Sequence, residues 1–154
     1  MKTKIRKFVK GFIALALSIA MISEAWGGLT FVSEAETKAV PSTAVAFPSS
    51  GVATYDFSQA NEYVITTKQQ WDAFVTATNG TNKITFEGKT IHLGANIDFK
   101  DVKIDSVGNS QDNPFKGKFN GQGYTLSNVR FEGGSLFRNI SGATVENLVL
   151  DKVT

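Results

Sequence analysis

The chain has 154 residues, of which 42% are hydrophobic and 19% are charged, and it contains no cysteine. The absence of cysteine excludes a disulfide framework, thiolate metal sites and thiol catalysis. Five of the 16 basic residues but only one of the 14 acidic residues lie in the first 25 positions, so the remainder carries 11 positive and 13 negative side chains. The alkaline pI therefore belongs to the N-terminus, and a basic surface for nucleic acid is not expected.

The N-terminus has the pattern of an export signal. Lysine and arginine residues at positions 2, 4, 6, 7 and 10 precede an uncharged, largely apolar run over residues 12–22. This length suits a signal peptide and falls short of the about 20 residues that a membrane-spanning helix needs. Small-x-small triplets predict cleavage after Ala25 or after Ala35. The alternative is an uncleaved anchor that continues to Val32, although Glu24 interrupts it. We expect a secreted or cell-surface protein that meets the membrane only through this segment.

Residues 36–61 have the composition of a flexible leader. They contain Pro41, Pro48 and many Ser, Thr and Ala residues, and their apolar side chains follow no sustained period. Such a segment gives no pattern from which a packed element could be predicted.

Residues 62–82 predict a strand followed by one amphipathic helix. Residues 62–66 are β-rich, and Thr67 with a glutamine three residues later matches a capping box. Trp71 and Phe74 then follow at helical spacing, and Asn-Gly at 79–80 supplies a stop signal. We expect the apolar face of this helix to cover the first coil of whatever fold follows.

A nine-residue phrase occurs twice in the C-terminal half. Residues 123–131 and 142–150 share the pattern G-x-T-φ-x-N-φ-x-φ, in which φ is apolar, and they begin 19 residues apart. A degenerate third copy covers residues 88–99, and residues 101–120 form a loop or an extra short coil between the copies. A strand-like phrase at a period of about 20 residues is typical of a β-solenoid. Residues 83–154 are therefore predicted to form coils that are mainly β.

Asn128 and Asn147 occupy the same position in the two phrases. The apolar alternation changes phase there, which indicates a corner, and asparagine tolerates left-handed dihedral angles. If the coils stack about 4.8 Å apart, the two side chains form a hydrogen-bonded ladder. The alternative is that each is an independent turn residue.

Two segments, NPFKGKFNGQGYTLSN at 113–128 and GSLFRNISG at 134–142, resemble the opening coils of secreted bacterial β-helix proteins with GLUG-type repeats. Residues 88–99 resemble the lead-in of that family, and the helix with Trp71 resembles its N-terminal cap. The resemblance implies a right-handed parallel β-helix, or solenoid, with a short N-terminal amphipathic capping helix. It names no ligand, because the family consists mostly of uncharacterised surface and secreted proteins.

Two features depart from this family. Where the family usually reads Gly-Leu-Phe-Gly, this chain has Ser-Leu-Phe-Arg at 135–138. Family members also continue for many more coils, whereas this sequence stops at Thr154. A last coil without a cap exposes strand edges and apolar side chains. We expect either that the natural gene continues or that the chain self-associates through its uncapped C-terminal coil.

Three sets of side chains are candidates for chemistry. His92 alternates with two apolar neighbours and has no titratable partner fixed beside it, so we expect a solvent-facing residue rather than a general base. The densest group of oxygen ligands for calcium lies in a loop whose acids alternate with lysines, so solvated loop charges are the expected alternative. Aromatic residues could stack on a sugar or could pack in the core. The oxygen-ligand set is Asp98, Asp101, Asp105, Asp112 and Asn113. The aromatic set is Phe115, Phe119 and Tyr124.

The sequence therefore predicts an exported β-solenoid binding or structural module on the cell surface or in the medium. Its partner would be a polysaccharide or another host or cell-surface ligand. No residue is assigned to catalysis, to a cofactor or to a metal. The alternative is the N-terminal part of a carbohydrate-active enzyme, a polysaccharide lyase or glycosidase, whose catalytic coils are not in this chain.

Overall fold

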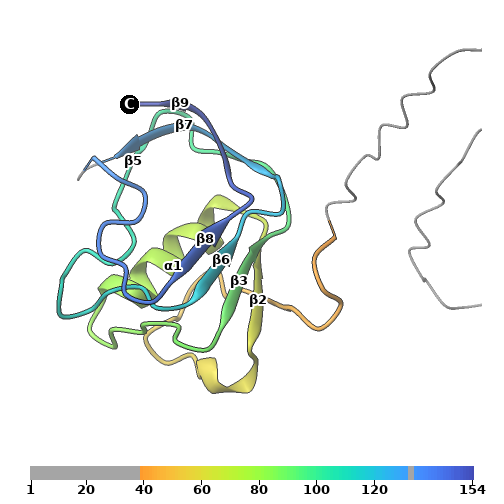
Figure 1. Cartoon of the computed structure of the whole chain (residues 1–154), viewed down its shortest axis with the longest axis vertical. Helices are drawn as coiled ribbons and strands as arrows, with labels where there is room; N and C mark the ends of the chain where they lie inside the picture. The colour runs from red at the N-terminus through yellow and green to blue at the C-terminus, as the bar shows by residue number, and fades with distance from the viewer. Residues whose placement is uncertain (1–38, 132–133) are drawn as a thin grey trace, which may run out of the picture. The chain divides into compact units, whose positions relative to one another are not determined.

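The computed structural model describes residues 39–131 and 134–154 (Figure 1). The predicted signal peptide and residues 36–38 of the predicted leader lie outside these ranges. In chain order the elements are β1 (Val45–Ala46), the 3₁₀ helix η1 (Phe57–Gln59), β2 (Glu62–Ile65), α1 (Lys68–Asn79), β3 (Thr90–Leu93), β4 (Ile97–Asp98), β5 (Lys103–Ile104), β6 (Lys118–Asn120), β7 (Thr125–Phe131), β8 (Thr144–Glu146) and β9 (Val149–Val153). The described part of the chain is thus mainly β with one α-helix, as the sequence predicts.

The helix α1 forms where its local signals place it. The Thr67 hydroxyl accepts a hydrogen bond from the backbone N–H of Gln70, and the Gln70 side chain accepts one from the backbone N–H of Thr67, both at 3.2 Å. This reciprocal cap satisfies two of the donors that a helix N-terminus leaves unpaired. At the other end, the N–H of Gly80 donates to the carbonyl of Thr76 at 2.8 Å. The prediction of a capped helix ending at Asn79 is confirmed.

Parallel pairing dominates the strands. One sheet has the order β1-β2-β3-β6-β8, and a second joins β4, β7 and β5, with β9 also paired to β7. All of these pairs are parallel. In the first sheet Tyr63, Ile91, Phe119 and Val145 are neighbours in register on β2, β3, β6 and β8. Equivalent residues are therefore 28, 28 and 26 positions apart, and the chain returns to the same sheet once in each such interval.

The two copies of the repeated phrase do not occupy equivalent places. Thr144 of the second copy pairs with Lys118 in the first sheet, whereas Thr125 of the first copy pairs with Val149 in the second sheet. The third, degenerate copy is the true equivalent of the last one, because Thr90 also pairs with Lys118. The predicted period of 19 residues is thus wrong. The phrase corresponds to a strand followed by a corner, and this unit lies in the first sheet in one of the two copies and in the second sheet in the other.

The predicted ladder between Asn128 and Asn147 is wrong for the same reason. Both residues have left-handed backbones, with φ of 51° and 52°, so the prediction of corners is confirmed. Their side chains point to other partners. Asn128 donates to Oδ1 of Asp98 at 2.8 Å, and Asn147 donates to Oδ1 of Asn120 at 3.2 Å. Each asparagine links its own turn to the preceding strand, at a different corner.

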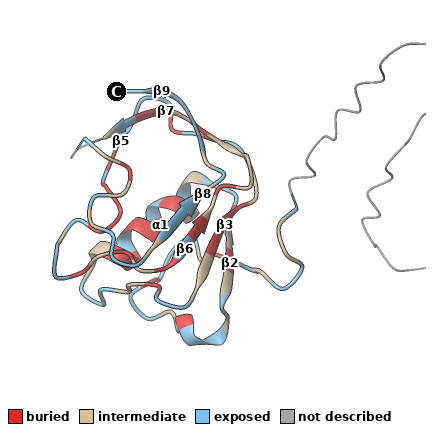
Figure 2. Cartoon of the chain, viewed as in Figure 1, coloured by how far each residue is buried: buried red, intermediate tan, exposed pale blue. Residues whose placement is uncertain are grey.

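Aromatic rings fill the space between the sheets and α1. Trp71 is fully buried and makes edge-to-face contacts with Phe99 and Phe119, with centroids 5.8 and 5.7 Å apart. Phe74 packs against Phe115 in the same geometry at 5.7 Å. Figure 2 shows the buried residues on the helix and the adjoining strands. The predicted apolar face of the helix is confirmed. It contacts Phe99, which follows β3 and β4, and Phe115 and Phe119, which lie next to or on β6.

The interpretation of residues 36–61 as a flexible leader is wrong for the described part of that segment. Val45 and Ala46 form β1, which pairs with β2. Phe47 is 1% exposed, and its ring lies 5.7 Å from that of Phe74. Phe57 is buried beside it in η1. Long-range packing of isolated aromatic residues orders this segment, and such packing leaves no period in the sequence.

Candidate functional site

The outer face of the first sheet carries two rows of side chains on β2, β3, β6 and β8. The inner residues of these strands, such as Ile91 and Phe119, are fully buried in the core, so alternation places their neighbours on the other side. The register gives the two outer rows as Glu62, Thr90, Lys118 and Thr144, and Val64, His92, Asn120 and Glu146. Polar and titratable groups from four strands are thus brought side by side.

His92 lies in the middle of this face. The sequence predicts its direction correctly, but its predicted solvent exposure is wrong, because His92 is only 4% exposed. Val64 and Asn120 flank it on the neighbouring strands, and the Gln122 side chain lies across it, with its Nε2 3.1 Å from the imidazole Nδ1. Neighbours along a parallel sheet therefore bury a residue that alternation alone places in solvent.

The contacts of His92 define its protonation. An amide Nε2 can only donate, so Nδ1 of His92 accepts and the neutral ring carries its proton on Nε2. That Nε2 has no hydrogen-bond partner among the described residues and lies 3.9 Å from Oε1 of Glu62. Burial lowers the pKa of His92, with the Glu62 carboxylate opposing this effect and Lys118 adding to it. The imidazole is therefore neutral at neutral pH and faces a carboxylate.

A second set of contacts runs along the same face toward β8. Nζ of Lys118 lies 2.8 Å from Oε1 of Glu146, and the same oxygen accepts from Nδ2 of Asn120 at 2.9 Å. Oδ1 of Asn120 in turn accepts from Asn147 and from the backbone N–H of Gln122. At the opposite end, the Thr43 hydroxyl donates to Oε2 of Glu62 at 2.6 Å. We call this linked row of polar side chains the outer stripe: Thr43, Glu62, His92, Lys118, Asn120, Gln122, Glu146 and Asn147.

The two carboxylates of the outer stripe are too far apart to act as a hydrolytic pair. Glu62 is on β2 and Glu146 is on β8, three strands away. At a strand spacing of about 4.8 Å, this separation is about 14 Å. Glycoside hydrolysis needs two carboxyl groups about 5 to 10 Å apart. The outer stripe therefore offers hydrogen-bond donors and acceptors along a line rather than a general acid facing a base.

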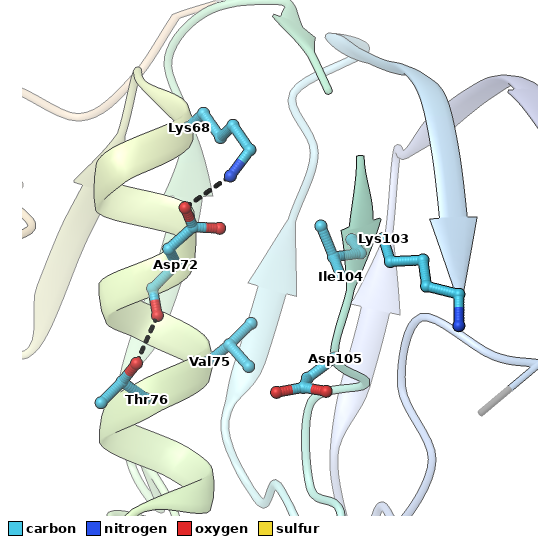
Figure 3. A pocket seen from close by; sticks show the side chains of 7 residues that line it. All are labelled: Lys68, Asp72, Val75, Thr76, Lys103, Ile104 and Asp105. Carbon is cyan, nitrogen blue, oxygen red and sulfur yellow. Dashed lines mark hydrogen bonds and ion pairs between the residues drawn. The ribbon is translucent and has the colours of Figure 1, made fainter. Parts of the chain in front are cut away.

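A hollow of about 280 Å³ lies between α1 and β5 (Figure 3). On its helix side, Nζ of Lys68 lies 2.6 Å from Oδ2 of Asp72, and the Thr76 hydroxyl donates to the Asp72 carbonyl. Val75 on the helix and Ile104 on β5 form the apolar part of the lining. Because the charges on the helix side are paired with each other, we place the candidate site on the outer stripe and not here.

The acidic residues weighed as calcium ligands are dispersed. Asp98 accepts hydrogen bonds from Asn128 and from the backbone N–H of Lys100, and these bonds lower its pKa. Asp105 lines the hollow beside α1, while Asn113 is buried and donates to the carbonyl of Thr78. Within residues 39–131 and 134–154, no three His, Cys, Asp or Glu side chains are placed to hold a metal ion. Asp101 and Asp112 are exposed.

The aromatic residues weighed as a sugar platform belong to the interior. Phe115 and Phe119 are fully buried, so neither ring can stack on a ligand, and both pack in the core, which is the other reading of these residues. Tyr124 is partly buried and packs against the core. Phe137, which forms an isolated parallel bridge with Val107, packs against Phe115 and Phe119 with centroids 5.4 and 5.3 Å apart.

Sequence reasoning missed most of the outer stripe. Glu62, Lys118, Gln122 and Glu146 are separated by up to 84 positions, and no local motif joins them. The signal that could have found them is the recurrence of 28, 28 and 26 positions between equivalent strand residues. A period of 19 residues aligns other positions and hides the rows.

Comparison of the chain with protein-family models, curated proteins and solved structures found no match. Among the described residues, no helix is long and apolar enough to cross a membrane.

Proposed function

We propose that the chain is an exported binding or structural module built as the first coils of a right-handed parallel β-helix of the GLUG-repeat type. The single observation that carries this proposal is the unbroken parallel register from β2 through β3 and β6 to β8. Stacking of this kind buries apolar residues such as Ile91 and Phe119 on one side. It displays aligned rows on the other side, which is how solenoids present extended binding surfaces.

The outer stripe is the surface that would bind. Its amide, hydroxyl and charged groups are held by one another, as in the Lys118–Glu146 and Asn120–Glu146 contacts, so they are arranged before a ligand arrives. Preorganised donors and acceptors lower the cost of ordering on binding. A polysaccharide, whose hydroxyl groups recur along a line, matches a row of polar groups that is repeated along a sheet. The lack of a close carboxylate pair on this face favours binding over hydrolysis there.

Co-sedimentation with insoluble polysaccharides tests this function. Chitin, cellulose and peptidoglycan serve as probes, and the bound fraction is measured for the wild type, for Lys118→Gln and for the control Lys83→Gln. Lys83 is an exposed lysine outside the stripe. We expect retention on at least one probe, with weaker retention only for Lys118→Gln. Equal retention of both variants would contradict a role for the stripe.

An enzymatic activity of the chain itself would have its own readout in the same experiment. A polysaccharide lyase releases unsaturated sugars and a glycosidase releases reducing ends, and either product would appear in the supernatant. Release by the purified chain would replace the binding proposal with the enzyme proposal. The alternative that places the catalytic coils outside this chain is tested on the rest of the reading frame, where additional coils with clustered acids and aromatic residues on one face would favour the enzyme.

A secreted or cell-surface location is part of the same proposal. It depends on the export pattern of residues 1–25, which lie outside the described residues. Fractionation of cells that express the chain tests it, because we expect the processed protein outside the cytoplasm.

A further inference from the structure

One column of side chains runs through the whole first sheet and is exposed only at its two ends. The register aligns Val45, Tyr63, Ile91, Phe119 and Val145 on the five strands β1, β2, β3, β6 and β8. The three inner members are fully buried. Val45 is 43% exposed and Val145 is 39% exposed. Both ends of an otherwise buried apolar column thus face solvent.

The strands that carry these valines are the two edges of the sheet. β1 pairs only with β2 and β8 only with β6 among the described strands. All neighbouring strands in the sheet are parallel. A second copy of the chain, translated along the stacking direction in the same orientation, can therefore place its β1 beside β8 of the first copy. The strands then continue as one parallel sheet. Exposed edges are templates for such pairing.

We infer that copies of this chain associate head to tail, with the β8 edge of one copy pairing with the β1 edge of the next. This inference goes beyond the proposed binding function and does not depend on it. The contact would place Val145 beside Val45 of the second copy, so that the exposed ends of two columns become one continuous buried column. Burying two half-exposed valines against each other is favoured by the hydrophobic effect.

The charges at the contact are compatible with a second copy. In register, the position next to Glu146 would be taken by Ala46, the small neutral residue after Val45. Oε1 of Glu146 is already held by Lys118 and Asn120 in its own copy. The contact therefore buries no carboxylate that lacks a partner, which is the arrangement that would oppose it.

The apolar surface on the β8 side is wider than one valine. In the second sheet, Leu150 and Val153 follow the buried Leu126 and Val129 in register, yet they are 44% and 40% exposed. Leu150 and Val153 on β9 thus repeat the behaviour of Val145 on β8, because each is the exposed last member of a row that is buried on the preceding strands.

The symmetry of the contact gives a specific prediction. A contact between two different edges is heterologous, so each added copy presents a new β8 edge and assembly remains open. A contact between two β8 edges would instead close as a dimer and leave Val45 exposed on both copies. The two arrangements differ in which edge must be intact.

Two edge variants and their mixture distinguish these arrangements. Val145→Lys blocks the β8 edge and Val45→Lys blocks the β1 edge, because edge lysines oppose strand addition. The chain is purified from its expression host, its N-terminus is defined by intact mass, and its association is followed by sedimentation velocity over a concentration series. Val102→Lys is the matched control, since Val102 is 49% exposed but lies on neither edge. Circular dichroism verifies the fold, and Val145→Thr and Val45→Thr are milder replacements if a lysine variant unfolds.

We expect the wild type and Val102→Lys to grow in mass with concentration. Each edge variant alone should associate about tenfold or more weakly, and an equal mixture of the two should form a dimer, because one intact β8 edge then meets one intact β1 edge. A wild type that stays monomeric throughout the series would overturn the inference. So would undiminished dimerisation of Val45→Lys alone, or a mixture of the two variants that remains monomeric.

Discussion

Asn147 donates a hydrogen bond from its Nδ2 to Oδ1 of Asn120, 3.2 Å away. The two amides belong to neighbouring turns of the chain, 27 positions apart. Asn120 also donates to Glu146, the residue before Asn147, so one strand residue holds both the end of β8 and the corner that follows it. This relationship takes the place of the ladder that the repeated phrase suggests.

The first prediction is that Asn120 and Asn147 are energetically coupled. Asn120→Ala should cost about 1 to 3 kcal/mol, because it removes a shared acceptor and a donor to Glu146. Asn147→Gly, which suits a left-handed backbone, should cost less. In a double-mutant cycle by urea unfolding, the pair should deviate from additivity by at least about 0.5 kcal/mol. Asn128 and Asn147 donate to different partners, Asp98 and Asn120, and serve as the control, for which additive costs are expected.

The second prediction concerns the packing of α1. Trp71→Ala should cost about 3 to 5 kcal/mol of unfolding free energy, because a fully buried ring leaves a cavity between Phe99 and Phe119. Trp71→Phe should cost clearly less, since the indole Nε1 has no hydrogen-bond partner in the described part of the chain. Thermal or urea unfolding measures both. A loss below about 1 kcal/mol for the alanine variant would contradict this packing.

The third prediction is a pH dependence set by His92. Burial lowers the pKa of the folded imidazole, while the pKa of an unfolded histidine is about 6.5. The unfolded state therefore binds a proton first as the pH falls. The stabilising contribution is present above about pH 6.5 and is lost as the pH falls through the folded-state pKa.

Urea unfolding across this range should show the loss, and His92→Gln should flatten it. Because His92 is the only histidine in the chain, one imidazole signal in an NMR titration reports its pKa directly. Glu62→Gln should lower that pKa further, since the carboxylate favours the charged ring. A pKa at or above the ordinary value would be incompatible with the buried position of the ring.

The fourth prediction concerns the close approach of two turns at Gly121. A Cβ there would lie 2.5 Å from the carbonyl oxygen of Asn147 and 2.6 Å from Cα of Leu148, both of which are backbone atoms. Gly121→Ala should therefore cost about 3 kcal/mol, at the upper end for overpacking. Gly142→Ala is the comparison, because it meets no atom within 4 Å and costs only the strain of its φ of 63°, about 1 to 2 kcal/mol. Equal costs would indicate that the turns can separate without penalty.

The fifth prediction is processing of the N-terminus. Export should yield a chain that begins at Trp26 or Glu36, as the two small-x-small triplets suggest. Intact-mass analysis identifies the new terminus. Full-length protein retained in the membrane fraction would indicate the uncleaved anchor instead.

Local chemistry was predictable from the sequence, and register was not. The capping box at Thr67, the apolar face with Trp71 and the left-handed corners at Asn128 and Asn147 all depend on residues within a few positions of one another. The pairing of Thr144 with Lys118 instead of Thr125 depends on how long each excursion is, and similar strand phrases on two faces look like one repeat.

The candidate site illustrates the same limit. Alternation placed His92 on the outer face, but only the neighbouring strands reveal that Val64, Asn120 and Gln122 surround it. Phe47 is a second example, because a single aromatic residue in a Ser- and Pro-containing segment carries no periodic signal although it is 1% exposed. Burial created by residues far along the chain cannot be inferred from a local pattern.

The narrow range of sequence separations between paired strands has a consequence for how the molecule folds. Paired residues in the named strands lie between 18 positions apart, as for Val45 and Tyr63, and 29 positions apart, as for Ile97 and Leu126. The entropy of closing a loop changes little over such a range, so each strand docks at a similar cost. Folding then resembles nucleation followed by propagation, because each strand that has docked offers its edge to the next strand. Opening should run in reverse from β8 and β9, and amide exchange should slow progressively toward β2.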